Sequence, residues 1–377
     1  MKFIDISGFE KEKDFLINAV NKNLVAHAQL FFGSQGSPNL TLALAFISFL
    51  NCNHKTSNDS CGECPSCKKI DKMIHPDLHF IFPVAPTTKI NKNVVSDLFI
   101  KEWRSFILKD PYQNVNDWFN FYGFENKSPN ISKDESRNLI KKLTLKPFES
   151  ENKIVLIWLP EHLHIYTSNA LLKILEDPPP KTFFFLITND YNRLLKTILS
   201  RVQMFKIRNF SDEELTKEIL KKNNIAESEL SKVILTSDGN LNQAKKIINS
   251  SNEDFLSVFK IWMRNCYSSD YAKIQLDLEW FNNQTRINKK AFLIYSLNLI
   301  RESFVVKINS SLSRIVDEES EFIKNFSKSL NEEKTEKVTL ELNDAIRFLE
   351  RNANPKIIFL DLSIEIVNVF NETKQIA

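Results

Sequence analysis

Four of the chain's five cysteines fall in one short segment, "NCNHKTSNDSCGECPSCKKI". They are Cys52, Cys61, Cys64 and Cys67, with the spacing C-x8-C-x2-C-x2-C. Two-residue gaps allow successive thiolates to turn onto one tetrahedral ion, and four sulfurs leave no open coordination position. The pattern therefore predicts a structural zinc knuckle rather than a catalytic metal. Two alternatives stay open: His54 as a ligand in place of Cys52, and four thiols without a metal.

A second segment, "GSQGSPNLT" at 33–41, has the frame of a phosphate-binding loop without its chemistry. In the pattern G-x-x-x-x-G-K-[ST], counted from Gly33, the second glycine is Pro38, the lysine is Asn39 and the hydroxyl is Leu40. Proline lacks the N–H donor and fixes φ. Asparagine carries no positive charge, and leucine cannot bind magnesium. ATP is therefore not expected to bind tightly, although Thr41 is one position from the hydroxyl.

The magnesium-binding half of a nucleotide site is also degenerate. Such a strand ends in acidic residues that hold the magnesium shell and polarise water. Here the strand reads "KIVLIWLPEHL", and the acidic positions hold Trp158 and Leu159. Glu161 comes two to three residues late, so no carboxylate is expected at the metal. For the loop at 33–41, the simpler alternative is that Gly33 and Gly36 form a G-x-x-G turn by chance, with no relation to phosphate binding.

Continuous apolar runs position these segments. The runs "AQLFF", "LHFIFPV", "KIVLIW" and "TFFFLIT" are typical of parallel strands that are covered on both faces. They alternate with helical patterns such as "LTLALAFISFL", which predicts a doubly wound α/β sheet. In "SNALLKILEDPPP" we expect a helix that Ser168 caps and Pro178 ends. Glu176 and Asp177 then read as an exposed helix end, rather than as a catalytic pair.

After Phe210 the pattern becomes helical to the end of the sequence. "SDEEL" is a capping box in which Ser211 is the N-cap and Glu214 reaches back. Two further helices break at Gly239, and Pro355 is expected to open the last helix. Lone Cys266 reads as a core residue, and "NSSLSRIVDEESE" as an exposed interhelical loop. We predict three parts: an α/β domain at 1–208, a small helical lid at 209–251 and an all-helical domain at 252–377.

A segment at about 84–130 interrupts the α/β pattern and reads as an insertion. It is rich in lysine, asparagine and aromatic residues, and Trp103, Phe106 and Ile107 have helical spacing on what we expect to be a surface helix. Basic and aromatic residues together can stack on single-stranded nucleic acid. Aromatic side chains that pack the insertion onto the domain are the favoured interpretation.

Composition sets the broad class. The chain has 377 residues, 42% hydrophobic and 26% charged, with a net charge of +3, which permits a nucleic-acid partner without demanding one. The N-terminal "MKFIDISGFEKEKDF" carries charges throughout and does not resemble a signal peptide. No apolar run approaches the roughly 20 residues of a spanning helix. We expect a cytoplasmic protein with no membrane segment, in which reduced thiols favour metal over disulfides.

Five sequence motifs occur along the chain in an order that is typical of one protein family. "HAQLFFGSQG", the cysteine knuckle, "HPDLHFIFP", "NALLKILEDPP" and "TILSRVQMF" follow one another. In this order they resemble the bacterial clamp-loader subunits of the replicative DNA polymerase III, an AAA+ family. The resemblance covers about residues 7–83 and 131–245, and is weaker over the C-terminal helices. It implies an AAA+-type domain, a helical lid and a helical collar that assembles a five-subunit ring.

Within that family, the departures at Pro38, Asn39, Leu40, Trp158 and Leu159 favour the delta-prime group over its gamma/tau relatives. The resemblance implies a subunit that is not an enzyme by itself and binds no ATP. It implies gamma/tau and delta subunits as partners, with the sliding clamp and primed DNA reached through the assembled complex. A sensor arginine of active relatives aligns loosely with Asn242.

One charged motif is retained: Ser200-Arg201 in "TILSRV". In clamp loaders this arginine reaches the ATP of the neighbouring subunit, where a guanidinium neutralises charge on the γ-phosphoryl oxygens. The alternative for Arg201 is a salt bridge within the chain. For the protein as a whole, two alternatives remain: a gamma/tau-like ATPase that uses Thr41 and Glu161, and a zinc-knuckle protein that binds nucleic acid through its insertion.

Overall fold

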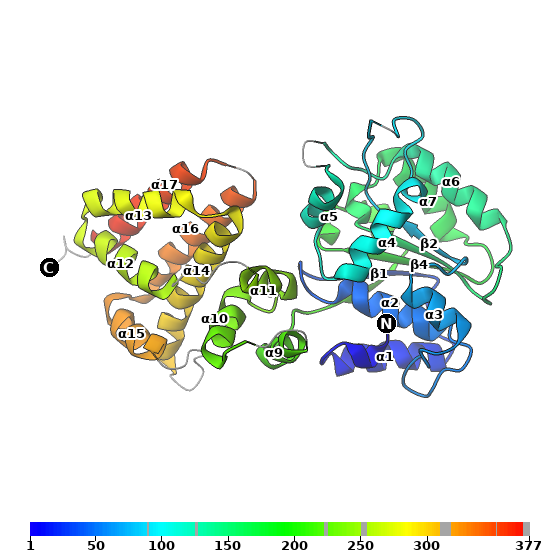
Figure 1. The fold of residues 1–377 in the computed structure, drawn as a ribbon, viewed down its shortest axis with the longest axis horizontal. Coiled ribbons are helices and arrows are strands. Elements are labelled where there is room, and N and C mark those ends of the chain that lie inside the picture. Colours follow the sequence, from blue (N-terminus) through cyan, green and yellow to red (C-terminus); the bar gives the residue numbers. More distant parts are fainter. Residues whose placement is uncertain are drawn as a thin grey trace. The chain divides into compact units, whose positions relative to one another are not determined.

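The computed structural model describes residues 1–88, 90–124, 127–221, 225–249, 255–309, 318–351 and 353–371. The chain forms two compact units (Figure 1). The first comprises Met1–Glu218 with Gly239–Asn242, and the second comprises Ile219–Asp238 with Gln243–Ala377. The assignment of 209–251 as a separate lid stays a prediction.

The first unit is built on a five-stranded parallel sheet with the strand order β2-β3-β4-β1-β5. Its strands are β1 (Ala28–Phe32), β2 (Leu78–Ile81), β3 (Lys153–Trp158), β4 (Thr182–Thr188) and β5 (Gln203–Lys206). Strand β1 pairs Leu30 with Leu186 of β4 and Met204 of β5. The carboxyl ends of parallel strands meet at one edge, so the segments after β1, β3 and β4 are neighbours there.

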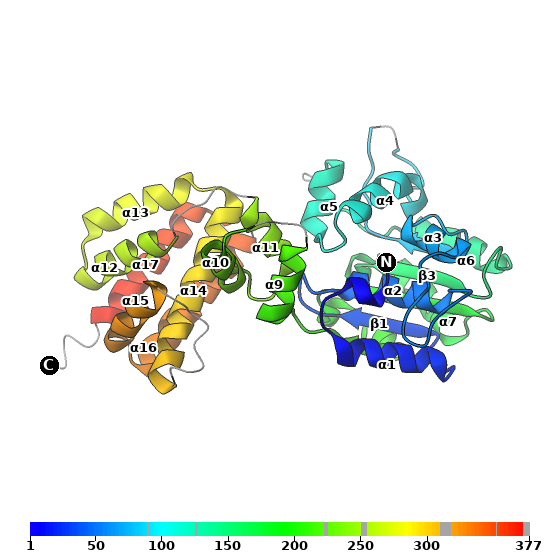
Figure 2. The ribbon, with the colours of Figure 1, turned by 60° about the horizontal axis from the view of Figure 1, so that its bottom comes forward.

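Helices cover both faces of this sheet, which confirms the predicted α/β class (Figure 2). On one face Leu30 packs in a cluster with Leu139 and Leu171. On the other, the ring of Phe31 lies 6.3 Å from that of Phe46. The helices of the unit are α1 (Glu10–Asn21), α2 (Asn39–Leu50), α3 (Pro65–Asp71), α4 (Ile100–Lys109), α5 (Val115–Tyr122), α6 (Lys133–Thr144), α7 (Ile165–Glu176), α8 (Lys196–Leu199) and α9 (Asp212–Leu220).

The insertion leaves the α/β pattern after β2, and its first and last residues lie side by side. Its two ends meet in an antiparallel bridge, where Val84 and Asn130 exchange backbone hydrogen bonds of 3.0 and 2.9 Å. Helices α4 and α5 lie between these ends. Trp103 and Trp118 are fully buried, so the aromatic residues pack the insertion onto the domain. The predicted surface helix is confirmed, because α4 buries Trp103, Phe106 and Ile107 on one face while Lys101 and Ser105 stay exposed.

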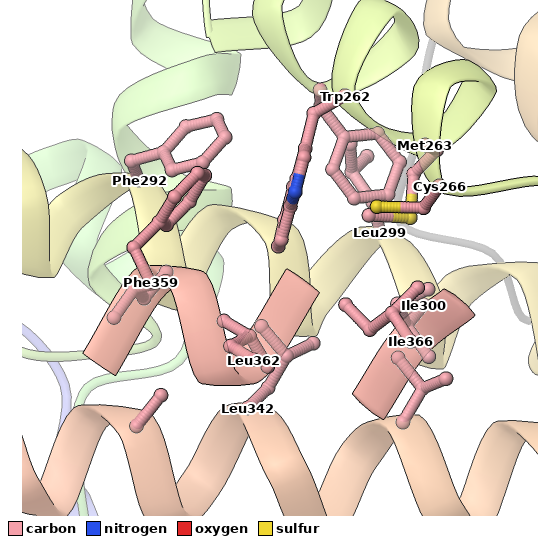
Figure 3. Close-up of a cluster of buried hydrophobic side chains, with 14 of the residues drawn as sticks. Trp262, Met263, Cys266, Phe292, Leu299, Ile300, Leu342, Phe359, Leu362 and Ile366 are labelled. Carbon is pink, nitrogen blue, oxygen red and sulfur yellow. The ribbon is translucent and has the colours of Figure 1, made fainter. Parts of the chain in front are cut away.

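In the second unit, all secondary structure among the described residues is helical. Trp262 stacks on Phe359 with ring centroids 4.8 Å apart (Figure 3). Its indole N–H donates to Ser363 Oγ over 3.0 Å. Cys266 is buried in this core, as predicted. The helices are α10 (Glu227–Ser237), α11 (Leu241–Ile248), α12 (Phe255–Ser268), α13 (Tyr271–Asn283), α14 (Arg286–Ile308), α15 (Glu318–Phe326), α16 (Glu332–Glu350) and α17 (Pro355–Asn371).

Several local predictions can be compared with these elements. Pro355 opens α17, and Ser211 and Glu214 exchange both hydrogen bonds of a capping box. Helix α7 begins earlier than predicted, with His164 as its N-cap, so Ser168 lies inside the helix. The loop expected near residue 315 falls mostly outside the described residues. Among the described helices, none is long and apolar enough to span a membrane.

Candidate functional site

The four clustered cysteines converge on one point. Their sulfur atoms all lie within 4.8 Å of one another. The Sγ–Sγ distances are 3.5 Å for Cys52–Cys61 and 3.9 Å for Cys61–Cys67. Four sulfurs at about 2.3 Å from a tetrahedral zinc would be about 3.8 Å apart. The cluster therefore fits a four-cysteine zinc site, and His54 does not belong to it among the described residues.

Backbone N–H groups surround these sulfurs. Cys61 N–H donates to Cys52 Sγ, Cys64 N–H to Cys61 Sγ and Cys67 N–H to Cys64 Sγ, over 3.3, 3.3 and 3.4 Å. The donation from Cys64 is the main reason why the pKa of Cys61 is lowered, to about 6. Burial instead raises the pKa of Cys67 to about 12. A divalent cation would favour the thiolate at both positions.

The loop after β1 forms hydrogen bonds within itself and to a neighbouring strand. Asn39, at the lysine position, is 3% exposed and its amide donates to Gly33 O and Thr188 O over 3.1 and 3.3 Å. Ser37 Oγ donates to Ser34 O over 2.6 Å and Asn39 Oδ1 over 2.7 Å. The polar side chains at this helix N-terminus are thus engaged within the protein.

Two substituted positions of the loop and the nearby Thr41 are also buried. Pro38 is the N-cap of α2, Leu40 is 5% exposed, and Thr41 donates its hydroxyl to Pro38 O over 3.0 Å. The hydroxyl that a rearranged loop would use for magnesium is therefore turned into the first turn of its own helix.

A segment from far along the sequence covers the loop. Leu241 N–H donates to Gly36 O over 3.3 Å. Gly36 has φ of +80°, and a Cβ there would lie 1.8 Å from Asn240 Oδ1. Only glycine combines that backbone conformation with so close an approach. Asn242, the loosely aligned sensor position, donates its amide to Asp117 Oδ2 over 2.8 Å and to Tyr112 O over 3.0 Å.

At the end of β3, apolar side chains occupy the two positions where a magnesium-binding strand has acidic residues. Trp158 is 4% exposed, and its ring lies 4.7 Å from that of Trp103. Leu159 has a positive φ of 58° and is buried. Neither position offers a side-chain oxygen ligand for a hard cation.

Glu161 lies closer to the loop than its place in the sequence indicates. A short 3-10 turn, Pro160–His162, follows β3 and brings the carboxylate back to the sheet edge. Thr188 Oγ1 donates to Glu161 Oε2 over 2.7 Å. Burial raises the pKa of Glu161, and the hydrogen bond from Thr188 partly opposes this. Sequence spacing did not reveal this contact, because the turn, and not the strand register, sets the position.

Ser200 and Arg201 follow α8 at the same unit's surface. Arg201 Nη2 lies 3.2 Å from Glu176 Oε2, and Nη1 donates to Thr197 O and Ser200 Oγ over 3.1 and 3.3 Å. Its Nε is buried without a hydrogen-bond partner among the described residues. The salt bridge that was the alternative for this arginine is therefore present, while 31% of the Arg201 side chain stays exposed.

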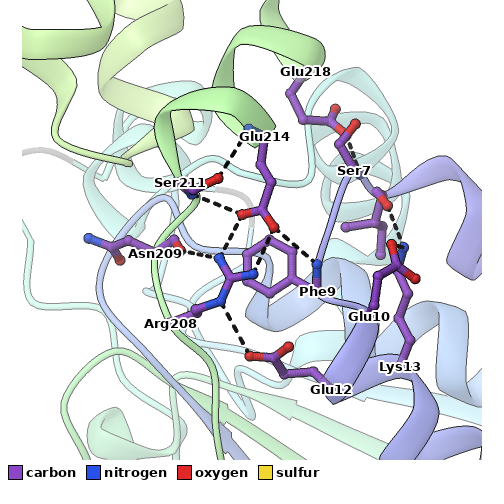
Figure 4. Close-up of polar contacts among 11 residues, drawn as sticks. Ser7, Phe9, Glu10, Glu12, Lys13, Arg208, Asn209, Ser211, Glu214 and Glu218 are labelled. Carbon is purple, nitrogen blue, oxygen red and sulfur yellow. Dashed lines mark hydrogen bonds and ion pairs between the residues drawn. The ribbon is translucent and has the colours of Figure 1, made fainter. Parts of the chain in front are cut away.

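The linker after β5 is held by a bidentate ion pair. Arg208 Nη1 and Nη2 lie 2.6 and 2.7 Å from the two carboxylate oxygens of Glu214, and the guanidinium covers the ring of Phe9 at 4.3 Å (Figure 4). Burial opposes ionisation of Glu214, but the Arg208 contacts and the Ser211 N–H lower its pKa to about 2. The sequence indicated only the helix cap. The ion pair fixes the segment that precedes α9.

Over more than half of its length, the chain matches one known protein family. The family described as "DNA polymerase III, delta subunit" matches residues 9–211. The tau/gamma subunit of DNA polymerase III from Haemophilus influenzae is 28% identical over 217 residues, which cover 58% of this chain and 25% of that protein.

Two further relatives have the same range of similarity. The gamma subunit from Buchnera aphidicola is 27% identical over 251 residues, 65% of this chain and 57% of its own length. The delta' subunit from Bacillus subtilis is 27% identical over 188 residues, 50% of this chain and 44% of its own length. The chain thus spans from a quarter to just over half of these relatives.

Proposed function

The chain belongs to the DNA polymerase III, delta subunit family, and we propose that it acts there as a delta-prime-like, non-catalytic clamp-loader subunit. It binds no ATP, assembles with gamma/tau and delta subunits, and helps to load the sliding clamp onto primed DNA from within that complex. Such a role places it in the cytoplasm. The zinc knuckle is a structural element of this subunit.

One observation carries the proposal. The positions that would bind phosphate and magnesium are filled by the protein's own side chains. Asn39 donates to Gly33 O and Thr188 O, where a lysine would contact phosphate. Trp158 packs on Trp103 where a carboxylate would hold magnesium. A nucleotide would need to displace buried groups while gaining neither a cation nor a metal ligand, so binding is unfavourable.

Arg201 gives the subunit a role in a neighbour's catalysis. An ion pair as exposed as that with Glu176, whose side chain is 67% accessible, contributes about 0–1 kcal/mol. The guanidinium can therefore exchange Glu176 for a phosphate of an adjoining subunit at small cost. There it would stabilise the charge that develops on the γ-phosphoryl oxygens. Glu176 in the free chain keeps Arg201 near the surface, and Ser200 accepts a hydrogen bond from it.

Co-purification tests the assembly. The chain is expressed with gamma/tau and delta subunits of the same organism, and the mass of the complex is measured. We expect a stable complex that contains one copy of this chain. Failure to join these subunits would exclude the proposal.

Substitution of Arg201 tests the role in trans. In the complex, Arg201→Ala should slow ATP hydrolysis at the one adjoining site by roughly 10³-fold. In a single-turnover experiment, the amount of ATP hydrolysed in the fast phase should fall by the share of that one site. Lys196→Ala is the matched control, because Lys196 is an exposed cation on α8, the short helix that Arg201 follows. Equal amounts of ATP hydrolysed in the fast phase by both variants would remove the arginine finger from the proposal.

A gamma/tau-like ATPase is the second candidate, and one observation favours it: Glu161 lies hydrogen-bonded to Thr188 at the sheet edge beside the loop. Against it, Thr41 is directed into its own helix. Glu161→Gln separates the candidates, because it would abolish hydrolysis by an ATPase and leave a non-catalytic subunit unchanged in the assembled complex. The third candidate, nucleic-acid binding by stacking, is weakened by the burial of Trp103 and Trp118.

A further inference from the structure

The insertion at 84–130 has no task in the function proposed so far. The insertion nevertheless makes three separate contacts with the degenerate nucleotide site of the first unit. The contacts involve the strand end at Trp158, the helix start at Thr41 and the covering segment at Asn242.

The first contact lies where a magnesium ligand would be. Trp158 packs against Trp103 at 4.7 Å and Phe106 at 6.3 Å, both from α4. Phe82, which precedes the insertion, stacks on Trp103 at 4.3 Å, and Trp118 of α5 donates its indole N–H to Pro83 O over 2.8 Å. The aromatic core of the insertion therefore includes the residue that replaces the acidic ligand.

The second contact lies at the start of α2, where phosphate would bind. The loop between α4 and α5 carries Tyr112, whose hydroxyl lies close to the Thr41 side chain. The Tyr112 ring lies 5.9 Å from Phe210 in an edge-to-face arrangement. Gln113 braces this loop by donating to Phe106 O and Asp110 O, over 3.0 Å in each case.

The third contact holds the segment 239–242. Asp117 lies at the third position of α5, where it completes a capping box with Asn114. Its Oδ2 accepts from Asn114 N–H over 2.9 Å and from Asn242 Nδ2 over 2.8 Å. Asn242 also donates to Tyr112 O over 3.0 Å. The insertion thus presents two acceptors to one amide, and charge-assisted bonds such as that to Asp117 are the stronger ones.

We propose that the insertion is an internal ligand that takes the place of the nucleotide and fixes residues 239–242 against the α/β unit. This rests on the proposed function, in which the subunit binds no ATP. In this role, Trp103 packs at the end of β3, where a magnesium ligand would lie, and Tyr112 lies at the start of α2. Asp117 binds the segment 239–242. The attachment of residues 239–242 then does not depend on ATP.

Amide hydrogen exchange on the full-length chain tests this role. Asp117→Ala and Asn242→Ala each remove the same charge-assisted bond, so exchange of 239–242 should become roughly tenfold faster in either variant. In the double variant the two effects should be less than additive, because both substitutions remove the bond between Asp117 and Asn242. Each also removes one bond of its own, from Asn114 N–H to Asp117 and from Asn242 to Tyr112 O. Asn116→Ala is the matched control, since Asn116 is an exposed neighbour on the same helix.

Peptides from α12 in the second unit and zinc content show whether a variant is folded. Unchanged exchange of 239–242 in both single variants would overturn the internal-ligand role and leave the proposed function intact. A second arm adds Mg·ATP to the unmodified chain. Protection of residues 33–41 by Mg·ATP would overturn the proposed function itself, whereas no protection is expected.

Discussion

Helix α2 lies between two motifs, a phosphate-type loop that departs from the consensus sequence and a cluster of four cysteines with ligand spacing. The phosphate-type loop at 33–41 leads into it, and the cysteine knuckle at 52–67 follows it. The helix is buried along almost its whole length. At the knuckle, four sulfurs converge on one point. At the loop, the polar side chains are engaged by the protein itself.

The comparison shows that a motif can keep its backbone conformation and its place in the fold without keeping the side chains that bind a ligand. The loop keeps its place after β1 and retains Gly33 and Gly36, and Gly36 is required there by its positive φ and by the close approach of Asn240. To bind a ligand, a loop also needs hydrogen-bond donors and acceptors that are not already paired with other groups of the protein. The knuckle has little apolar core of its own, so its cysteines have no comparable structural use without a metal.

The largest expected effect concerns the knuckle. Cys64→Ser should remove the metal, which at full occupancy is about one zinc per chain, and should lower the thermal stability of the first unit strongly. The measurement is metal content by mass spectrometry together with thermal unfolding. His54→Ala should keep its zinc, because His54 does not belong to the sulfur cluster among the described residues. A Cys64→Ser protein with full metal content would contradict the four-cysteine site.

The next effect concerns the acidic position at the end of β3. Trp158→Asp restores the residue type of an active site, yet it should destabilise the chain by about 3–5 kcal/mol, because it removes a buried ring and buries a carboxylate. Trp158→Phe should cost much less, since a ring still packs against Trp103. The free energy is read from urea unfolding followed by circular dichroism. A neutral Trp158→Asp would show that the site is open rather than filled.

The smallest effect concerns the linker that borders the loop. Glu214 has a folded pKa of about 2, against 4.5 in a free side chain. Its ion pair with Arg208 therefore stabilises the fold above about pH 4.5, and this contribution is lost as the pH falls toward 2.

Glu214→Gln should consequently cost about 1–2 kcal/mol at pH 7, with a difference from the unmodified chain that shrinks below pH 4.5. Urea unfolding at a series of pH values measures this. Glu213→Gln serves as the control on the adjacent, exposed residue. A Glu214→Gln penalty that does not change with pH would assign the role of Glu214 to packing instead of charge.

The sequence predicted the features that depend on local spacing. Four strands follow continuous apolar runs, and the cysteines follow a ligand spacing. Strand β5 was missed because it is a short edge strand whose side chains are mostly exposed, so it carries no apolar run. The hydrogen bond between Asn242 and Tyr112 was also missed. It joins residues far apart in the sequence, and no periodicity encodes such a contact.

Equilibrium dialysis of Mg·ATP against the purified, zinc-loaded chain distinguishes a filled site from an open one. A gamma/tau subunit is dialysed in parallel as the nucleotide-binding reference. At millimolar ATP we expect no nucleotide retained above the buffer concentration by this chain. One ATP bound per chain at micromolar concentration would show that the site after β1 still functions, and would contradict a subunit whose nucleotide site is filled by its own side chains.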